Sequence, residues 1–592
     1  MKEFFKYVGA TVVGLILTGI IVSIFFFIAL TGFAMAGSSS EAISDNSVLV
    51  LKLSGVMNER SEDNPLSMLT KQAKPSGLND ILAAINKAKK DDKIKGIYIE
   101  TGMLVPDSYA SLQAIRDALQ DFRKSKKWII AYGDSYTQGA YYVASAADSV
   151  FLNPSGQVMW NGLSAQPVYY KDLMAKFGVK VQVAKVGTYK SYTETYTADQ
   201  MSDANREQTT AYMNVLWKTI TQAVSQSRNI PVASLNEYAD SMITFADTKE
   251  YVKTKLVDRL LYTDQVKDVV KKKLGIDTGD DINQVSVRQI IDNDADDDSD
   301  DDGDGKIAVY YAYGSIVSGE LPSAGDEHVI DCQKVCRDLE DLAKVDDVKA
   351  VVLRVNSGGG SAYASEQIWH QIVELKKKKP VVVSMGGMAA SGAYYMSAPA
   401  NWIVAEPTTL TGSIGIFGMF PDVSGLLTDK LGVKFDVVKT NAHSDFATLA
   451  RPFTPEEMRF LEGYINRGYQ LFRKRVADGR HMTTEQVERV AQGHVFAGED
   501  ALKIHLVDQL GGLDTAVAKA AQLAKLTDYT TKEYPEEESW IDAFLDDDVM
   551  GSYLDGRMRA ELGPLYEPMM FLRNINKQNA IQARIPYIIN VE

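Results

Sequence analysis

The chain has 592 residues, of which 45% are hydrophobic and 24% are charged, and its formal net charge is −15. A chain of this length is too long for a single hydrophobic core, so the length predicts several domains. The acidic balance excludes nucleic acid as the expected partner, because phosphate binding needs a basic patch or stripe and the sequence shows none.

The first predicted element is an apolar segment long enough to cross a bilayer. No charged residue occurs between Lys6 and Glu41, and residues 8–36 exceed the roughly 20 apolar residues that a membrane-spanning helix needs. Cleavable signal peptides have apolar regions of only about 7–15 residues, so the length favours an uncleaved anchor, although the Ala-Met-Ala sequence before Gly37 leaves cleavage open. Because lysines precede the segment and acidic residues follow it, residues 1–46 are predicted to form a cytoplasmic N-terminus and a transmembrane helix, with the rest of the chain exported.

The exported part of the chain repeats itself. Four segments of its first half recur in its second half, and matched positions lie 250 to 254 residues apart. The pairs are YASLQAI with YASEQIW, QGAYY with SGAYY, KFGVKVQVAKV with KLGVKFDVVKT, and KLVDRL with HLVDQL. So constant a spacing predicts two homologous domains, at residues 47–290 and 306–526.

Each repeat alternates apolar strand patterns with helical patterns. In the second repeat we predict strands at residues 306–317, 349–357, 380–386 and 402–407, and helices at residues 361–378 and 391–399. Nearly continuous apolar strands between helices are typical of the α/β class, in which helices cover mostly parallel sheets. Functional groups in such folds gather where a strand ends and a helix begins.

Two segments fall outside the repeats. Residues 291–305 are strongly acidic, and their mutual repulsion predicts a solvated linker. A calcium loop is a weak alternative there, because Tyr311 would occupy the terminal ligating position and a strand follows at once. Residues 527–592 form a C-terminal extension without a counterpart in the first repeat, and the sequence leaves open whether they pack against the domain or serve assembly.

The two cysteines lie four residues apart on a predicted helix. Cys332 and Cys336 are too few for a four-ligand metal site, and their spacing is not that of a CxxC motif. We expect two half-buried thiols, with a local disulfide or a redox role as the alternative.

Ser391 follows a predicted strand and opens a predicted helix. A serine before a glycine most often caps a helix, but here residues 356–362 place three consecutive glycines after the preceding strand. Glycines allow close backbone approach, so the N–H of Gly359 or Gly360 would join that of Gly392 in an oxyanion hole. A tight strand-to-helix turn is the structural alternative.

A serine nucleophile also needs a base. None of the six histidines lies in a motif that marks a general base. A lysine serves instead when burial keeps it neutral, since an ordinary ammonium provides almost no free amine at pH 7.

Motifs in both repeats resemble a known peptidase family. The segments RVNSGGGSAYASE, VVVSMGGMAASGAYYMSAP, TLTGSIGIFG and KVGTYKSYTE are similar to the long, tandem-repeat form of signal peptide peptidase, a serine–lysine peptidase with a Clp protease/crotonase-like fold. The resemblance runs from the anchor to about residue 526, with QARIPY echoing the family's end. It implies that Ser391 is the nucleophile, that Lys190 is the general base and that Ser413 orients the lysine. It also implies that Gly359 and Gly392 supply the oxyanion N–H groups.

The chain departs from the family pattern at one position of the segment at residues 356–362, called the glycine turn below. Gly358 stands where the family usually has proline, which loosens the turn but leaves the two glycines that follow. Activity is therefore still expected.

The resemblance also implies a function and a location. It predicts a membrane-anchored endopeptidase that degrades remnant signal peptides and other hydrophobic peptides after preprotein processing, without a metal or another cofactor. The enzyme would lie in the bacterial inner membrane with its catalytic domain outside the cytoplasm. It would form a homo-oligomer, a tetramer by analogy with the family.

The repeat offers a test of the site that is independent of the family. Each repeat lacks the groups that the other retains, which predicts one shared site built from two half-sites. Whether these half-sites meet within one chain or between protomers is left open. The offsets pair Ser391 with Gln138, Ser413 with Trp160, Gly359 and Gly360 with Val105 and Pro106, and Lys190 with His443 or Ser444.

Alternatives exist for the base and for the function. His443 follows Ser391 at nearly the spacing that separates Lys190 from Gln138, so a serine–histidine pair within one repeat is possible. A catalytically silent, membrane-anchored scaffold or chaperone that binds apolar segments is the alternative function. A hydratase of the same broad fold is disfavoured, because no acidic residue is marked near the glycine turn.

Overall fold

The computed structural model describes residues 42–61, 76–295, 305–319, 328–536 and 581–584, together with residues 18, 558 and 566. The predicted transmembrane segment, most of the acidic linker and most of the C-terminal extension lie outside these residues. Within the described part of the chain, no helix is both long and apolar enough to cross a membrane.

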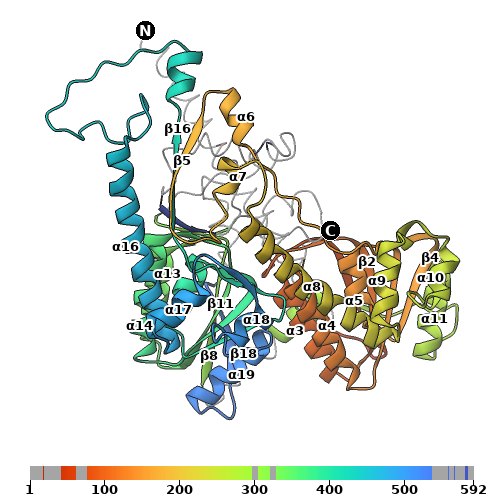
Figure 1. The fold of residues 1–592 in the computed structure, drawn as a ribbon. Helices are drawn as coiled ribbons and strands as arrows, with labels where there is room; N and C mark the ends of the chain where they lie inside the picture. Colours follow the sequence, from red (N-terminus) through yellow and green to blue (C-terminus); the bar gives the residue numbers. More distant parts are fainter. Residues whose placement is uncertain are drawn as a thin grey trace, which may run out of the picture.

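The first repeat is built on a parallel sheet of six strands in the order β6-β4-β3-β2-β1-β7. Its strands are β1 (Ser47–Met57), β2 (Ile94–Pro106), β3 (Trp128–Tyr136), β4 (Ser149–Val158), β6 (Arg259–Leu260) and β7 (Gln284–Ser286). Its helices are α3 (Leu78–Lys90), α4 (Tyr109–Arg123), α5 (Gln138–Ala144), α6 (Lys171–Lys176), α7 (Glu194–Thr197), α8 (Asp203–Arg228), α9 (Val232–Asp240), α10 (Thr248–Lys253), α11 (Thr263–Leu274) and α12 (Val287–Ala295), with a 3-10 turn at Ile243–Phe245. Figure 1 shows its sheet on the right with α5, α9, α10 and α11, whereas α6 and α7 lie near the top.

The second repeat has a corresponding, mostly parallel sheet in the order β17-β15-β13-β11-β8-β19, with β14 beside β13 and β18 beside β14. Only β17 runs antiparallel to its neighbour. The strands are β8 (Lys306–Tyr313), β11 (Val348–Ser357), β13 (Val381–Ala390), β14 (Trp402–Ala405), β15 (Leu410–Gly412), β17 (Val495–Ala497), β18 (Gln509–Leu510) and β19 (Thr530–Tyr534). The helices are α13 (Cys332–Leu342), α14 (Ala362–Lys376), α15 (Gly392–Ser397), α16 (Pro455–Arg480), α17 (Thr484–Val490), α18 (Gly498–Lys503) and α19 (Leu513–Ala524), with a π-helical turn at Leu426–Lys430.

A third sheet joins the two repeats. Its order is β10-β9-β12-β20-β16-β5, and it combines β5 (Lys180–Lys185) of the first repeat with β16 (Phe417–Asp422) of the second. The remaining strands are β9 (Ser315–Val317), β10 (Val329–Asp331), β12 (Gly359–Ser361) and β20 (Ile581–Arg584). Figure 1 shows β5 and β16 side by side above the second repeat, with α6 and α7 beside them.

The strand patterns predicted in the second repeat are confirmed, with one correction. Nearly every residue of β11 and β13 is buried, as expected for strands covered on both faces. The single strand predicted at residues 306–317 is wrong, because the chain turns at Gly314 and continues as β9 in the third sheet. Gly314 has φ +94, and an added Cβ would lie 2.0 Å from the His328 carbonyl oxygen, so only glycine fits this turn.

A buried ion pair connects the repeats. Arg354 on β11 and Glu59, which follows β1, lie 2.9 Å apart, and both side chains are almost fully buried. Asn356 Nδ2 also donates a hydrogen bond to Glu59 Oε1 at 3.0 Å. Removing one partner of such a pair would leave an uncompensated buried charge, so this contact holds the first repeat against the sheet that carries the glycine turn.

Four further sequence predictions concern the linker, the C-terminal extension, the cysteines and the fold relation. Helix α12 ends at Ala295, within the predicted linker, and β19 lies in the predicted extension and pairs with β8. Cys332 is buried, Cys336 is half-buried and both thiols are free. The relation to the Clp protease and crotonase fold stays a prediction.

Candidate active site

Ser391 occupies a strained turn between β13 and α15. Its backbone has φ 57 and ψ −114, a conformation that residues other than glycine rarely adopt. Its N–H donates a hydrogen bond to the carbonyl oxygen of Gly412 at 2.8 Å, which ties the turn to the end of β15. The following residue begins α15, so the Ser391 hydroxyl lies where a strand meets a helix.

Lys190 reaches this serine from the other repeat. Strand β5 pairs with β16 over six residue pairs, and the chain then turns so that Lys190 Nζ lies 2.7 Å from Ser391 Oγ. The same nitrogen donates to Ser413 Oγ at 3.0 Å and to the Ser413 carbonyl oxygen at 3.3 Å. The structure therefore brings Ser391, Lys190 and Ser413 together within one chain.

The Lys190 side chain is buried and tightly enclosed. It is only 1% exposed, and burial lowers the pKa of its ammonium well below the ordinary value. The Phe417 ring centroid lies 6.0 Å from Nζ. A Cβ added at Gly493 would come within 2.8 Å of the Lys190 Cβ, and one at Gly415 within 3.3 Å of its Cδ. Glycines thus allow two backbone segments to enclose the lysine.

Several of these neighbours were not singled out by sequence reasoning. The His494 carbonyl oxygen accepts the Ser413 N–H at 2.7 Å, and the His494 ring stacks on Tyr189 at a centroid distance of 4.1 Å. The only signal in the sequence was the glycine before this histidine, at position 493. A single glycine in a loop does not reveal that a distant lysine packs against it.

The two predicted oxyanion residues are adjacent in space. Gly359 has φ +100, and a Cβ there would lie 2.8 Å from the backbone nitrogen of Gly392. Gly392 is the first residue of α15, so its N–H has no intrahelical acceptor. The Gly359 N–H donates to Ser357 Oγ at 3.1 Å. In this structure Ser357 Oγ therefore accepts the hydrogen bond of one of the two predicted oxyanion donors.

Strand β20 covers the glycine turn. It pairs antiparallel with β12, placing Ala583 opposite Gly360, and it pairs antiparallel with β16 on its other edge. A Cβ on Gly359 would lie 2.1 Å from the Ala583 carbonyl oxygen. Both Ser391 and Lys190 are buried, so a substrate must displace part of this covering or enter beside it.

The corresponding turn of the first repeat is closed by hydrogen bonds. Gln138 begins α5, and its Oε1 accepts the N–H groups of Asn161 and Gly162 at 3.1 and 3.0 Å. Its Nε2 donates to the Tyr109 hydroxyl at 3.1 Å and to the Gly162 carbonyl oxygen at 3.2 Å. Trp160, which stands in the place of Ser413, is buried and donates its indole N–H to the Leu235 carbonyl oxygen. In the first repeat, the Gln138 amide and the Trp160 indole thus stand at the positions that Ser391 and Ser413 have in the second repeat.

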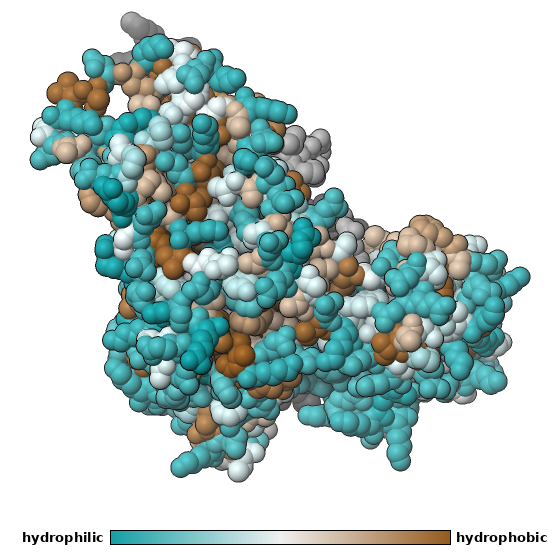
Figure 2. Space-filling model, viewed as in Figure 1, coloured by the Kyte–Doolittle hydropathy of each residue, from teal (hydrophilic) through white to brown (hydrophobic). Residues whose placement is uncertain are grey.

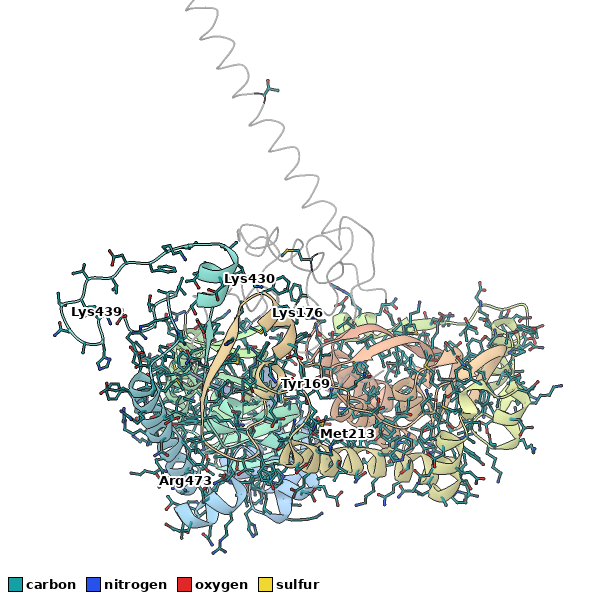
Figure 3. All side chains as sticks on the ribbon, turned by 45° about the horizontal axis from the view of Figure 1, so that its top comes forward. Tyr169, Lys176, Met213, Lys430, Lys439 and Arg473 are labelled. Atoms are coloured by element: carbon teal, nitrogen blue, oxygen red, sulfur yellow. The ribbon has the colours of Figure 1, made fainter. Side chains whose placement is uncertain are left out.

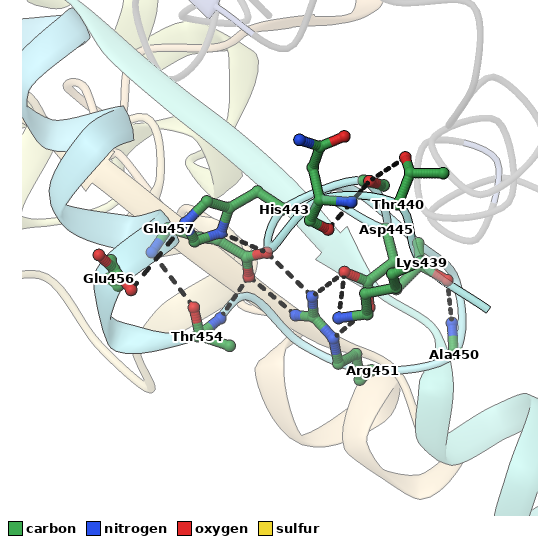
Figure 4. A network of polar contacts seen from close by, with 12 residues as sticks. Lys439, Thr440, His443, Asp445, Ala450, Arg451, Thr454, Glu456 and Glu457 are labelled. Carbon is green, nitrogen blue, oxygen red and sulfur yellow. Dashed lines mark hydrogen bonds and ion pairs between the residues drawn. The ribbon is translucent and has the colours of Figure 1, made fainter. Parts of the chain in front are cut away.

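His443 lies elsewhere. It belongs to the exposed segment 431–450, and its ring nitrogens lie 3.8 Å from Glu457 and 4.0 Å from Glu456 (Figure 4). Ser391 is fully buried and forms its hydrogen bond with Lys190. The alternative in which His443 is the base for Ser391 within one chain is therefore wrong.

No metal site is found among the residues that the structure describes. None of their His, Cys, Asp and Glu side chains form a group of three or more that would hold a metal ion. The acidic stretch considered as a calcium loop lies largely outside these residues.

Comparison with known proteins agrees with the repeat. The model of peptidase family S49 matches residues 121–277 and 373–527, once in each repeat. Protease 4 of Salmonella typhi is 36% identical over 580 residues, covering 94% of this chain and 91% of its own. Protease 4 of Haemophilus influenzae is 33% identical over 547 residues, covering 88% and 86%. The chloroplastic serine protease SPPA of Arabidopsis thaliana is 28% identical over 489 residues, covering 82% and 70%. The chain therefore belongs to peptidase family S49 and is a serine-type peptidase with two copies of the family's domain.

Proposed function

We propose that the chain is a membrane-anchored endopeptidase in which Ser391 is the nucleophile and Lys190 is its general base. The observation that carries the proposal is the 2.7 Å contact between Lys190 Nζ and Ser391 Oγ in a buried site. Burial lowers the pKa of the Lys190 ammonium and so favours the neutral amine, whose lone pair accepts the serine proton at this distance.

The proposed mechanism has two stages, in which an acyl-enzyme forms on Ser391 and is then hydrolysed. Lys190 accepts the proton of Ser391 while Oγ attacks the carbonyl carbon of a peptide bond, and the resulting ammonium then protonates the leaving amine. Water next attacks the acyl-enzyme with Lys190 again as base, which releases the second product and restores the Ser391 hydroxyl. Ser413 binds Nζ throughout and is a positioning residue.

The oxyanion would be bound by backbone N–H groups at the glycine turn. The Gly392 N–H has no intrahelical acceptor, and Gly359 lies directly beside it. We propose that the substrate oxygen replaces Ser357 as acceptor of the Gly359 N–H, so that both donors bind the negative charge.

The proposed substrates are hydrophobic peptides, above all remnant signal peptides, and the proposed location is the bacterial inner membrane. The apolar segment at residues 8–36 supports an anchor with the N-terminus in the cytoplasm, and the sequence resemblance supports the substrate class. Protease added to intact spheroplasts checks the location. Degradation of the domains would support an exported orientation, and protection would contradict it.

Labelling and cleavage test the catalytic assignment. Full-length protein in detergent is incubated with a fluorophosphonate probe and, separately, with a synthetic signal peptide. We expect the wild type and His443→Ala to react with both, and Ser391→Ala and Lys190→Met to react with neither. Folding of each variant is checked by thermal denaturation. Labelling in Lys190→Met at the wild-type rate would overturn the lysine assignment, and absence of labelling in the folded wild type would favour a silent scaffold.

A further inference from the structure

Lys190 lies on a loop, so contacts from outside that loop must set its position. Residues 186–193 form neither a helix nor a strand. Catalytic groups need to be held within about 0.5 Å of their productive geometry, and loops hold them less precisely than helices or strands. The Tyr189 N–H donates to the Gln492 carbonyl oxygen at 2.9 Å, which fastens the loop on the side that precedes the lysine.

One buried glutamine binds the residues on both sides of Lys190. Gln208 belongs to α8 and is only 1% exposed. Its Nε2 donates a hydrogen bond to the Tyr189 carbonyl oxygen at 3.2 Å and to Ser191 Oγ at 3.1 Å. The side-chain amide therefore spans the lysine, because it contacts the residue before it and the residue after it.

The same amide also binds the second repeat. Gln208 Oε1 accepts the N–H of Val495, the first residue of β17, at 3.0 Å. The residue before it, His494, accepts the Ser413 N–H through its carbonyl oxygen. A backbone N–H only donates and a carbonyl oxygen only accepts, so these partners fix which end of the amide faces which repeat. Gln208 thus connects the lysine loop to the segment that supports Ser413.

Neighbouring polar side chains hold Gln208 itself. Asn205, one turn earlier in α8, faces Gln208 Nε2 with its Oδ1 at 3.2 Å. Asn205 Nδ2 donates to Glu194 Oε2 at 3.0 Å, and the Ser202 hydroxyl donates to Glu194 Oε1 at 2.6 Å. Buried polar groups are nearly always hydrogen-bonded, and a connected network of this kind leaves a side chain with one favoured orientation.

The second repeat contains a counterpart of α8 without this glutamine. Helices α8 and α16 both have 26 residues, both begin after a residue whose side chain caps the helix, and both end in an arginine that binds an aspartate. These residues are Ser202 and Thr454 for the caps, and Arg228 with Asp258 and Arg480 with Asp508 for the ion pairs. The two caps lie 252 positions apart, as do the two arginines, and this offset places Phe460 at the position of Gln208.

The counterpart position lies beside the counterpart of the lysine loop. The ring centroids of Phe460 and His443 are 5.4 Å apart. His443 is one of the two residues that the repeat offsets pair with Lys190. The same helix position therefore lies next to the same loop in both repeats, and only the repeat that carries the lysine has an amide there.

The surroundings of the two helices differ in the same sense. Figure 3 shows Met213, on α8, in the middle of the molecule and Arg473, on α16, at its edge. The flank along which α16 runs in Figure 1 is mainly hydrophilic in Figure 2. Phe460 is 56% exposed, whereas Gln208 is enclosed between the repeats.

We infer that Gln208 is a positioning residue that holds the loop at residues 189–191 against β17, so that Lys190 Nζ is directed at Ser391 Oγ. The inference rests on the proposed role of Lys190 as general base. Gln208 acts through the residues beside the lysine and not on the substrate. A displacement of about 1 Å at a catalytic group lowers the rate about 100-fold, so the loss of these hydrogen bonds should be visible in the kinetics.

Labelling kinetics separate this role from a structural one. Full-length protein in detergent is treated with a fluorophosphonate probe, and the rate constant and the final extent of labelling are both measured. Gln208→Met keeps the side-chain volume but removes the hydrogen bonds. We expect it to reach the full extent at a rate about 10- to 100-fold lower, and to lose the same factor in kcat for peptide hydrolysis with little change in KM. A lower extent at the wild-type rate would overturn the inference, because it would mean fewer folded molecules and a correctly placed base.

A second glutamine between the repeats provides the matched control. Gln182 Oε1 accepts the Phe453 N–H at 2.8 Å, so this side chain also links the first repeat to the second, but away from the lysine loop. Gln182→Ala should therefore be labelled at the wild-type rate. Equal losses in Gln182→Ala and Gln208→Met would overturn the inference.

The partner of Gln208 on the lysine loop allows a double-mutant test. Ser191→Ala removes one acceptor of the Gln208 amide and should slow labelling less than Gln208→Met does. Combined with Gln208→Met it should cause no further loss, because the shared hydrogen bond is already absent. An unchanged rate in Ser191→Ala, or additive losses in the double variant, would overturn the inference. Ser191→Ala also keeps the test decisive if Gln208→Met does not fold.

Lys190→Met distinguishes failure of this inference from failure of the proposed function. If Lys190→Met is not labelled while Gln208→Met is labelled at the wild-type rate, only the role of Gln208 is overturned. Labelling of Lys190→Met at the wild-type rate would overturn the base assignment, and the inference with it.

Discussion

The two repeats share one turn and use it differently. In the second repeat the turn carries Ser391, whose hydroxyl lies 2.7 Å from an amine that comes from the other repeat. In the first repeat Gln138 stands in the same place, and its amide forms four hydrogen bonds with its own surroundings. The difference shows that the turn is stable with either side chain, and that the catalytic arrangement depends on the partner brought in from outside the repeat.

The pairing of β5 with β16 explains how the first repeat supplies the lysine that the second repeat lacks. The residue that approaches the nucleophile is 201 positions away in the sequence, and its position is set by the pairing of β5 with β16. Neither repeat alone contains both groups. Four experiments test this difference between the repeats, and the largest change is expected at the nucleophile and its base.

The largest effect is expected where the two repeats meet. Ser391→Ala and Lys190→Met should each lower kcat/KM by about 10⁴-fold or more. The two residues act as a unit, so removing either one abolishes the contribution of both. The double variant should be no worse than either single one. The rate of peptide hydrolysis at substrate concentrations well below KM measures the loss. Additive losses in the double variant would show that the two residues act separately.

A smaller loss is expected at the positioning residue. Ser413→Ala removes a 3.0 Å hydrogen bond to Lys190 Nζ and should lower kcat about 10- to 100-fold with little change in KM. The variant should also shift the acidic limb of the pH–rate profile, because the lysine loses a polar neighbour. Ser413→Thr, which keeps the hydroxyl, should recover much of the activity. An unchanged pH profile would leave Ser413 with a structural role only.

Burial of Lys190 should make the stability of the protein depend on pH. Its folded-state pKa is depressed, so the unfolded chain binds one more proton between that pKa and about 10.4, the ordinary lysine value. Stability therefore rises with pH across this window. Lys190→Met abolishes this term, and its stability relative to the wild type should increase by about 1.4 kcal/mol for each pH unit lost within the window.

Urea denaturation of both proteins from pH 6 to pH 10 measures this effect. The advantage of Lys190→Met should level off below the folded-state pKa of the lysine. Activity should be retained across this window and should decline only as the pH falls through the folded-state pKa of Lys190, because protonation there removes the base. Parallel stability curves for the two proteins would mean that Lys190 is charged in the folded state.

The smallest effect is expected in the first repeat. Gln138→Ala leaves the N–H groups of Asn161 and Gly162 without their acceptor, which should lower the free energy of unfolding by about 1–3 kcal/mol. Cleavage by Ser391 should stay close to the wild-type rate. A large loss of activity in a stable Gln138→Ala protein would show that the first repeat takes part in catalysis beyond Lys190.

The sequence predicts the parts of this molecule that local patterns encode. The strand and helix patterns around Ser391 were confirmed because burial on both faces leaves nearly continuous apolar runs. The break at Gly314 was missed because a glycine at the end of an apolar run does not show that the next residues join another sheet. The proximity of Lys190 to Ser391 was expected only from the complementary losses in the repeats and from the family resemblance.

Other parts of the site had no local signal. Gly493 packs against Lys190, and β20 covers the glycine turn from a segment far along the chain. Such contacts depend on how the sheets are assembled, and residue type alone does not report them. The same holds for Ser357, whose hydroxyl occupies the Gly359 N–H.

The backbone at Ser391 has a consequence that reaches beyond its side chain. Ser391 and Ser413 both have positive φ, at 57 and 49, whereas Gln138 and Trp160 are not among the residues with positive φ. Such a conformation costs about 1–3 kcal/mol for a residue with a side chain. The repeat without the serine pair has relaxed to ordinary backbone at both positions. The backbone angles alone, without any side chains, would thus already distinguish the second repeat, which carries the serine pair, from the first.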